Sequence, residues 1–216
     1  MDEKKRIVLV EDHPVFRMGM SELINQEPDL DVCAWAEDVT DAWQEIFRCQ
    51  PDLVIVDITL KSSDGLELVR ELKKSCSHIP VLVLSMHQET LFAERSVMAG
   101  ARGYIMKQEA PALVVTAIRK VLAGKLYFSL PVMEKMVQTF TASPADPDHD
   151  SPVDRLTARE FDVFKLLGQG MTSRQIAARL NLSIKTIGTY RERIKEKLNL
   201  KDANELFMYA VTWEKQ

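Results

Sequence analysis

The stretch Leu53-Val54-Ile55-Val56-Asp57 contains four aliphatic residues followed directly by a carboxylate. An apolar run of this length, with no polar residue between its members, is typical of a strand buried on both faces of a parallel sheet. A segment of about 10–15 residues with helical spacing follows it, and this order recurs along the first half of the chain. The other apolar runs lie at residues 7–10, 32–36, 81–84 and 103–106.

Five apolar strands that alternate with helices predict an α/β fold, a doubly wound five-stranded parallel sheet with helices on both faces. In such a sheet the carboxyl ends of the strands meet at one edge, and ligands bind beyond that edge. Polar residues that directly follow a strand are therefore the first candidates for a functional site.

The composition excludes several classes of protein. Of the 216 residues, 46% are hydrophobic and 28% are charged, as in an ordinary globular chain of one or two domains. No apolar run approaches the roughly 18 residues of a membrane span, and the run at 7–10 is shorter than a signal-peptide core. We therefore expect a cytoplasmic protein without membrane association. The three cysteines are widely spaced and form no C-x-x-C pair, so they support neither a disulfide framework nor a zinc site.

Charge and composition divide the chain into two parts. Residues 1–130 contain 15 Lys and Arg against 20 Asp and Glu, whereas residues 151–216 contain 12 against 8. Residues 143–152 include three prolines, three aspartates and no aliphatic side chain larger than alanine, a composition that does not fold by itself. We predict one domain at 1–126, a linker helix and flexible linker at 127–152, and a second domain at 153–216. The basic second domain is a candidate for binding a polyanion.

The second domain has the pattern of an all-α domain. Thr157 and Thr172 each begin a capping box, in which Glu or Gln stands three residues after the first Thr. Ser183 and Asp202 are further candidates for helix starts. The pattern predicts two helices within residues 171–201, joined by a tight turn at 181–182, and a last helix near the C-terminus.

Charged or hydroxyl residues stand at the ends of four of the predicted strands. Because these ends converge, we expect three carboxylates, one hydroxyl and one ammonium at one edge of the sheet. Close carboxylates need a compensating cation, and hard oxygen ligands suit Mg²⁺. A divalent cation beside a carboxylate and a lysine is typical of phosphoryl transfer, with Asp57 as the expected nucleophile. The residues are Glu11, Asp12, Asp57, Ser85 and Lys107.

These motifs resemble a known family. Residues 5–125 resemble the receiver domain of two-component signalling proteins, and the motifs occur in the order and spacing of that family. The resemblance implies a phospho-acceptor regulator whose only enzymatic activity is slow self-dephosphorylation. The matching motifs are Val8-Leu-Val-Glu11-Asp12-His-Pro, Leu53-Val-Ile-Val-Asp57, Asp64-Gly65, Val83-Leu-Ser85 and Gly103-Tyr104-Ile-Met-Lys107.

The resemblance also implies a role for each site residue. Asp57 would accept a phosphoryl group from the phosphohistidine of a sensor histidine kinase. Glu11, Asp12 and Asp57 would bind Mg²⁺ together with the backbone carbonyl of Thr59.

Three further roles follow from the same resemblance. Ser85 and Lys107 would bind the phosphoryl group, and Tyr104 would be the aromatic switch residue that changes rotamer, although a plain packing role for Tyr104 is the alternative. Gln108 stands where many receivers have a proline, so a cis X-Pro bond cannot form there.

The rest of the chain resembles a DNA-binding domain. Residues 154–213 resemble the helix-turn-helix domain of the NarL/FixJ, or LuxR-type, response regulators. The resemblance implies a transcription regulator that binds double-stranded DNA as a homodimer, with the last helix as a two-fold contact. The matching motifs are Leu156-Thr-Ala-Arg-Glu160, Gly170-Met-Thr-Ser-Arg-Gln-Ile-Ala and the segment from Ile184 to Leu198.

The predicted helix over 183–198 has one packed face and one free face. Ile184, Ile187, Ile194 and Leu198 form the apolar stripe, so the opposite face is available to the DNA major groove. We expect base-edge contacts from Lys185, Gly188, Thr189 and Glu192. Phosphate contacts are expected from Arg174, Arg191, Arg193, Lys195 and Lys197, although Arg191 lies towards the packed side.

Two residues of this face have two interpretations each. Gly188 costs about 1 kcal/mol of helix stability relative to Ala. Its presence indicates either a close approach to DNA or simple tolerance of the glycine. Glu192 could accept a hydrogen bond from a cytosine amino group or pair with Lys195 on the same helix, and the pairing is favoured.

Two other functions fit parts of the sequence. Asp57-Ile58-Thr59 weakly resembles haloacid-dehalogenase-type phosphatases, but those enzymes need a second aspartate as general acid where this chain has Thr59, so rapid turnover is not expected. A basic tail that binds protein rather than DNA is the second alternative, which Gly188 and Glu192 leave open. Absence of DNA binding at low salt would favour it.

Overall fold

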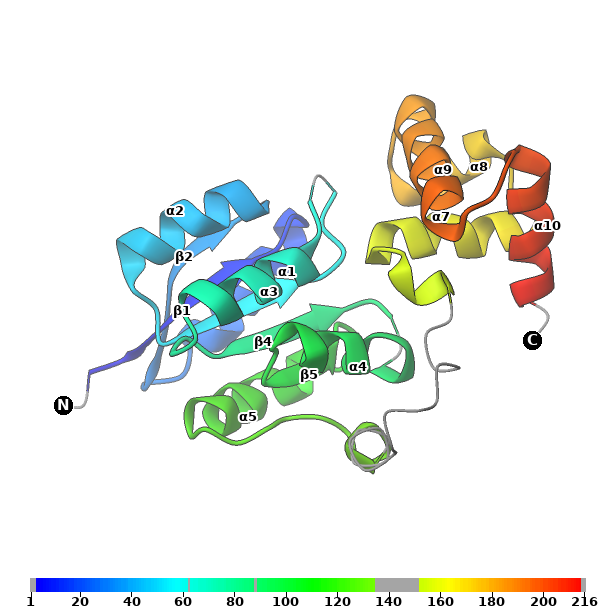
Figure 1. The fold of residues 1–216 in the computed structure, drawn as a ribbon. Coiled ribbons are helices and arrows are strands. Elements are labelled where there is room, and N and C mark those ends of the chain that lie inside the picture. Colours follow the sequence, from blue (N-terminus) through cyan, green and yellow to red (C-terminus); the bar gives the residue numbers. More distant parts are fainter. Residues whose placement is uncertain (1–2, 62, 88, 135–151, 215–216) are drawn as a thin grey trace. The chain divides into compact units, whose positions relative to one another are not determined.

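The computed structural model describes residues 3–61, 63–87, 89–134 and 152–214, and the chain divides into two compact units, Met1–Ser143 and Pro144–Gln216 (Figure 1). The helical pattern expected after residue 130 is helical at 130–134, and its remainder lies outside the described residues. The flexible linker expected at 143–152 also lies outside them, except for its last residue. None of the described helices has the length and apolar character needed to cross a membrane.

The first unit is built on a five-stranded sheet in which every pair of neighbours is parallel. All the predicted strands are present, and the predicted α/β fold class is confirmed. The strand order is β2-β1-β3-β4-β5, so the chain reverses its direction of travel across the sheet between β1 and β3. The strands are β1 (Lys5–Val10), β2 (Leu30–Ala36), β3 (Leu53–Asp57), β4 (Val81–Ser85) and β5 (Gly103–Met106).

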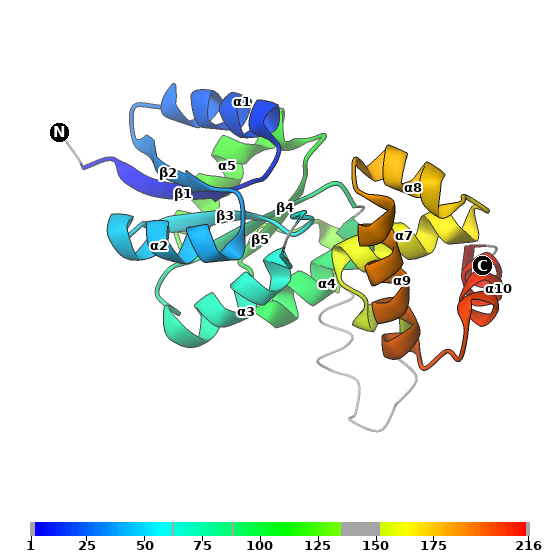
Figure 2. The ribbon, with the colours of Figure 1, turned by 90° about the horizontal axis from the view of Figure 1, so that it is seen from above.

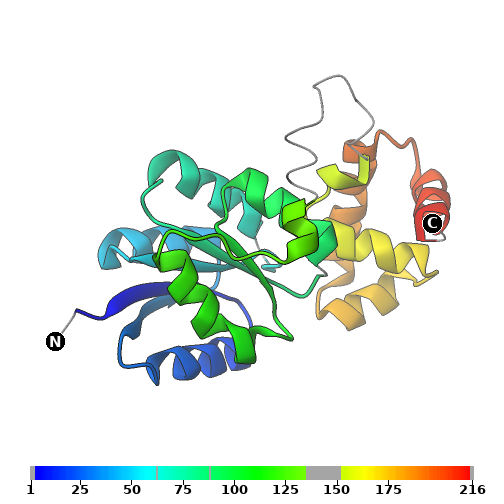
Figure 3. The same cartoon turned by 90° about the horizontal axis from the view of Figure 1, so that it is seen from below.

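Five helices cover both faces of this sheet. Helices α1 and α5 lie side by side on one face, and α2, α3 and α4 lie on the other (Figures 2 and 3). This is the doubly wound arrangement predicted from the alternating pattern. The helices are α1 (Pro14–Asn25), α2 (Val39–Cys49), α3 (Gly65–Ser75), α4 (Glu89–Ala99) and α5 (Ala110–Leu122).

The strands are apolar without alternation because both of their faces are buried. Ile7, Leu9, Leu53 and Ile55 belong to a core cluster that includes residues of α1 and α5. Successive side chains of a strand point to opposite faces, so the intervening residues face α2, α3 and α4. These residues, Val8, Val10, Val54 and Val56, are also fully buried.

The start of α3 lies directly against the end of β3. The carboxylate of Asp64 caps the helix by accepting a hydrogen bond from the backbone N–H of Leu66 at 3.0 Å. At Gly65 an added Cβ would come within 2.1 Å of the carbonyl oxygen of Asp57, a distance that no side chain can occupy. The glycine is therefore required by this close approach of backbone to backbone.

The second unit is helical, with the helix starts that the sequence predicts. The capping boxes at Thr157 and Thr172 are both formed, and the Ser183 hydroxyl accepts a hydrogen bond from Thr186 N–H. Asn181 ends α8 in the left-handed region, with φ of 54°, and makes the tight turn into α9. The helices are α7 (Ala158–Gly168), α8 (Ser173–Leu180), α9 (Ile184–Leu198) and α10 (Ala203–Glu214), preceded by the 3-10 turn η2 (Pro152–Arg155).

Two glycine substitutions test the close approach at the end of β3. Gly65→Ala should lower the free energy of unfolding by roughly 1–3 kcal/mol, because the new methyl group must displace the backbone of Asp57. Gly19→Ala is the matched control, since none of the described atoms lies within 4 Å of a Cβ at this position in α1. It should raise stability by about 1 kcal/mol through helix propensity. Urea unfolding of the full chain measures both, and equal effects would contradict the close approach.

Candidate functional site

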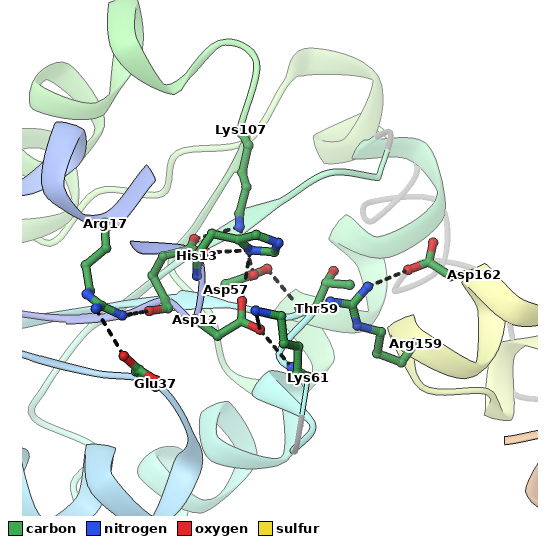
Figure 4. A network of polar contacts seen from close by, with 11 residues as sticks. Asp12, His13, Arg17, Glu37, Asp57, Thr59, Lys61, Lys107, Arg159 and Asp162 are labelled. Carbon is green, nitrogen blue, oxygen red and sulfur yellow. Dashed lines mark hydrogen bonds and ion pairs between the residues drawn. The ribbon is translucent and has the colours of Figure 1, made fainter. Parts of the chain in front are cut away.

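Residues from the carboxyl ends of three strands meet in one buried cluster. Glu11 directly follows β1, Asp57 ends β3 and Lys107 directly follows β5. The Lys107 Nζ atom lies 2.6 Å from Glu11 Oε2 and 2.8 Å from Asp57 Oδ2 (Figure 4). Glu11 and Asp57 are fully buried, and Lys107 is 6% exposed. One ammonium group thus bridges two buried carboxylates, as the convergence of the strand ends predicts.

The third carboxylate, Asp12, borders this cluster. Its Oδ2 atom accepts a hydrogen bond from the backbone N–H of Lys61 at 3.1 Å, and the Lys61 Nζ atom lies 3.6 Å away. The Nδ1 atom of His13 lies 2.9 Å from Asp12 Oδ1 and 3.0 Å from Glu11 Oε1. Asp12 therefore links the segment after β1 to the loop after β3.

The sequence alone predicted no role for His13 or Lys61. The position of His13 directly after two predicted site carboxylates was a usable signal, because three successive residues of one turn cannot lie far apart. Lys61 gave no such signal, since its approach to Asp12 depends on the path of the loop after β3.

The burial of the cluster shifts the protonation equilibria of its groups. Burial raises the pKa of the Asp57 carboxyl above its ordinary value, and the Lys107 ammonium opposes this shift only in part. Burial alone would lower the pKa of Lys107, but the carboxylates of Asp57 and Glu11 outweigh burial and raise it. Because its pKa is raised, Lys107 keeps its ammonium form at neutral pH, and an ionised Asp57 would be stabilised by a further cation.

The arrangement of donor atoms fits a small divalent cation. One ligand atom from each of Glu11, Asp12, His13 and Asp57 lies within 4.8 Å of the others. Carboxylate oxygens dominate this set, which is the donor chemistry that Mg²⁺ prefers. Thr59 is 4% exposed and its N–H donates a hydrogen bond to Asp57 Oδ1 at 2.8 Å, so this residue also lies beside the cluster.

Ser85 and Tyr104 both hold the loop that follows β4. The Ser85 hydroxyl accepts a hydrogen bond from the backbone N–H of His87 at 3.0 Å, and the backbone carbonyl of Ser85 accepts one from Lys107 N–H at 2.7 Å. Tyr104 is 2% exposed and its hydroxyl donates to the backbone carbonyl of His87 at 3.0 Å. A movement of the Ser85 side chain can therefore affect His87, the residue whose backbone carbonyl Tyr104 contacts.

The exposed face of α9 is a second candidate surface, in the other unit. Ile187, Ile194 and Leu198 are buried as predicted, but Ile184 is 52% exposed. The prediction that Ile184 belongs to the packed stripe is wrong: Ile184 is the first residue of α9, directly after the N-cap Ser183, and lies at the exposed end of the stripe. The exposed residues from the predicted DNA-binding set are Arg174, Lys185, Gly188, Thr189, Glu192 and Arg193.

Several predicted DNA-binding side chains have partners within this unit. Arg191 donates a hydrogen bond from Nη1 to the Ser173 hydroxyl at 2.8 Å. Lys197 Nζ lies 2.6 Å from a carboxylate oxygen of buried Glu160, so both cations contribute to helix packing.

Glu192 and Lys195 form an ion pair on α9. The Lys195 Nζ atom lies 2.7 Å from Glu192 Oε2, which is the pairing that the sequence favours, whereas a contact of Glu192 with a cytosine amino group stays a prediction.

Comparison with protein families assigns both units. Residues 7–119 match the response regulator receiver domain, and residues 154–210 match the luxR family of bacterial regulatory proteins. A relative from Staphylococcus epidermidis, named oxygen regulatory protein NreC, is 30% identical over 210 residues, which are 95% of this chain and 96% of the relative.

Solved structures show the same fold. A two-component response regulator of the LuxR family from Aurantimonas sp. SI85-9A1 is 34% identical, with a TM-score of 0.58 over 65% of this chain and 100% of that chain. A structure of the RcsB response regulator in complex with DNA is 22% identical, with a TM-score of 0.56 over 97% and 98% of the two chains. The chain therefore belongs to the two-component response regulators, in which a receiver domain is followed by a luxR-type DNA-binding domain.

Proposed function

We propose that this response regulator accepts a phosphoryl group on Asp57 from the phosphohistidine of a sensor histidine kinase, and that the modification controls DNA binding by its second domain. The observation that carries the proposal is the Lys107 ammonium between the buried carboxylates of Glu11 and Asp57, 2.6 and 2.8 Å away. A nucleophilic carboxylate beside a fixed cation is the arrangement that phosphoryl transfer requires.

In the proposed reaction, a carboxylate oxygen of Asp57 bonds to phosphorus while the bond between phosphorus and the donor imidazole nitrogen breaks. The Thr59 N–H holds the Asp57 carboxylate through Oδ1, and Lys107 neutralises charge at Oδ2 and binds a phosphoryl oxygen. When held by Glu11, Asp12, Asp57 and the Thr59 carbonyl, Mg²⁺ would neutralise charge on the carboxylates and the phosphoryl oxygens.

The loop after β4 offers a path from this chemistry to the surface. The Ser85 hydroxyl, which now accepts from His87 N–H, would turn to donate to a phosphoryl oxygen. The loop would then lose one of its restraints, and the Tyr104 hydroxyl would exchange its bond to the His87 carbonyl for another position. Tyr104 is thus the proposed switch residue.

We further propose that α9 enters the DNA major groove with its exposed face, in a homodimer on DNA. Lys185, Gly188 and Thr189 lie on that face near the N-terminal end of the helix, where base edges are reached. A protein of the same fold, RcsB, has been solved in complex with DNA. Arg174 and Arg193 are exposed and are the strongest candidates for phosphate contacts. Four other candidates would have to leave or share their partners within the unit to contact DNA. They are Glu192, Lys195, Arg191 and Lys197.

The geometry favours a regulator over a phosphatase. Thr59 occupies the position of the general acid that haloacid-dehalogenase-type phosphatases need, and a hydroxyl cannot supply a proton as a carboxylic acid does. Slow self-dephosphorylation is the expected limit. The proposal also includes a cytoplasmic location and three segments of the chain, with limits at 1–126, 127–152 and 153–216.

Phosphoryl acceptance is tested with acetyl phosphate and Mg²⁺ on the full chain. The wild type should gain the mass of one phosphoryl group, and Asp57→Asn should gain none because it lacks the nucleophilic carboxylate. Asp52→Asn is the matched control, since it removes a carboxylate just before the opposite end of the same strand. Full modification of Asp57→Asn would contradict the assignment.

DNA recognition is tested by selecting bound fragments from a random pool, with and without Mg²⁺ and beryllofluoride as a phosphoryl mimic. Enrichment of a two-fold symmetric site only in the treated wild type, and in neither Asp57→Asn sample, is the expected result. Equal enrichment in all samples would show that DNA binding does not depend on modification of Asp57. No enrichment, even at low salt, would favour a protein-binding output.

Asp57→Asn should also raise the free energy of unfolding by about 1 kcal/mol or more at pH 7 in EDTA, because it removes a buried charge while Lys107 keeps Glu11 as partner. The pKa of Asp57 is raised in the folded state, so stability from its neutral form is present below the ordinary pKa and is lost as pH rises through the folded pKa. In Asp57→Asn, the free energy of unfolding should not show this decline with rising pH. Urea unfolding at several pH values measures it, and an unchanged pH profile would count against the buried charge.

Gly188→Ala separates helix stability from DNA binding. In the part of the chain that the structure describes, no atom lies within 4 Å of a Cβ at this exposed position, so the substitution should stabilise α9 by about 1 kcal/mol. DNA affinity should nevertheless fall if the glycine permits close approach to DNA. Unchanged affinity for the selected site would show that the glycine is merely tolerated.

A further inference from the structure

We propose that Arg17 is a positioning residue for the acidic cluster of Glu11, Asp12, His13 and Asp57, because its side chain holds the segment that carries Glu11 and Asp12. The inference rests on the proposed function, since it concerns binding of Mg²⁺ and phosphoryl transfer at that cluster. Arg17 lies in the first turn of α1, and it belongs to none of the residue sets that the sequence motifs identified.

Arg17 makes two hydrogen bonds to the segment of residues 11–13. Its backbone N–H donates to the carbonyl of His13 at 2.9 Å, and its Nη1 atom donates to the carbonyl of Glu11 at 2.9 Å. The N–H of Glu11 in turn donates to the carbonyl of Ala36 at 2.9 Å. The backbone of Glu11 is thus held at its N–H by the end of β2 and at its carbonyl by α1.

The guanidinium is itself fixed on two further sides. Its Nη2 atom lies 3.1 Å from Glu37 Oε1, and its Cζ atom lies 3.9 Å from the centroid of the Trp35 ring. Figure 4 shows Arg17 and Glu37 beside Asp12, on the other side of it from Lys61. The side chain of Arg17 is 10% exposed, whereas those of Glu37 and Trp35 are about half exposed, so the bond from Arg17 to the Glu11 carbonyl is the buried one among these contacts. A charge-assisted hydrogen bond in buried surroundings is stronger and more directional than an exposed one.

This geometry gives Arg17 an effect on the carboxylates that it does not touch. The backbone of Glu11 and the following residues determines where the carboxylates of Glu11 and Asp12 project. Some residues hold a metal ligand in position without contacting the metal. Replacing such a residue commonly lowers metal affinity by about 10–100-fold. Lysine cannot reproduce the contacts, because it lacks the planar group that reaches a carbonyl, a carboxylate and a ring at once.

The test measures Mg²⁺ affinity of the full chain by titration calorimetry. Arg17→Ala and Arg17→Lys should each bind Mg²⁺ about 10-fold more weakly than the wild type, or worse. Arg119→Ala is the matched control: Arg119 pairs with Glu27 and Asp29 in the same unit, and none of these residues belongs to the acidic cluster. It should retain the wild-type affinity. Urea unfolding in EDTA establishes that each variant is folded.

The outcomes distinguish this inference from the proposed function. Wild-type Mg²⁺ affinity in folded Arg17→Ala, or an equal loss in Arg119→Ala, would overturn the positioning role alone. If Arg17→Ala does not fold, Arg17→Lys decides, and wild-type affinity in that variant would overturn the role. If the wild type itself neither binds Mg²⁺ nor accepts a phosphoryl group from acetyl phosphate, the proposed function fails, and the inference fails with it.

Discussion

The ammonium of Lys107 between the carboxylates of Glu11 and Asp57 is the interaction on which the rest of the receiver depends. Two buried carboxylates repel each other and lose their hydration, so they can remain together only beside a cation. The cation comes from β5, whereas the carboxylates come from β1 and β3. The parallel sheet therefore brings together the carboxyl ends of strands that are distant in the sequence. Burial that raises the pKa of Asp57 also gives a bound divalent cation a large effect there.

Each neighbour of this interaction is held by a short-range restraint. The Thr59 N–H fixes one oxygen of Asp57, and the absence of a side chain at Gly65 lets α3 begin against the same residue. Arg17 fixes the backbone of Glu11 from the opposite side. Since the site is built from backbone contacts as well as charges, its geometry would be changed by substitutions that leave every predicted ligand in place.

The cations of the second unit differ in their surroundings. Lys197 and Arg191 contact partners on neighbouring helices, whereas Arg174 and Lys185 are exposed. Not every cationic side chain of a basic helix is therefore available for contacts with DNA phosphates. Gly188 lies beside open space, because no atom of the described residues comes within 4 Å of a Cβ built at this position.

The sequence alone determined the strands, most helix starts and the set of strand-end residues, because hydrophobic period and capping are local properties of the chain. Tertiary structure decided the strand order, the entry of His13 and Lys61 into the acidic cluster, and the diversion of Lys197 to Glu160. These features depend on loop paths and on contacts between residues far apart in the chain. Local patterns carry no information about which of several possible partners a long side chain will meet, and only the packing of the whole unit selects one.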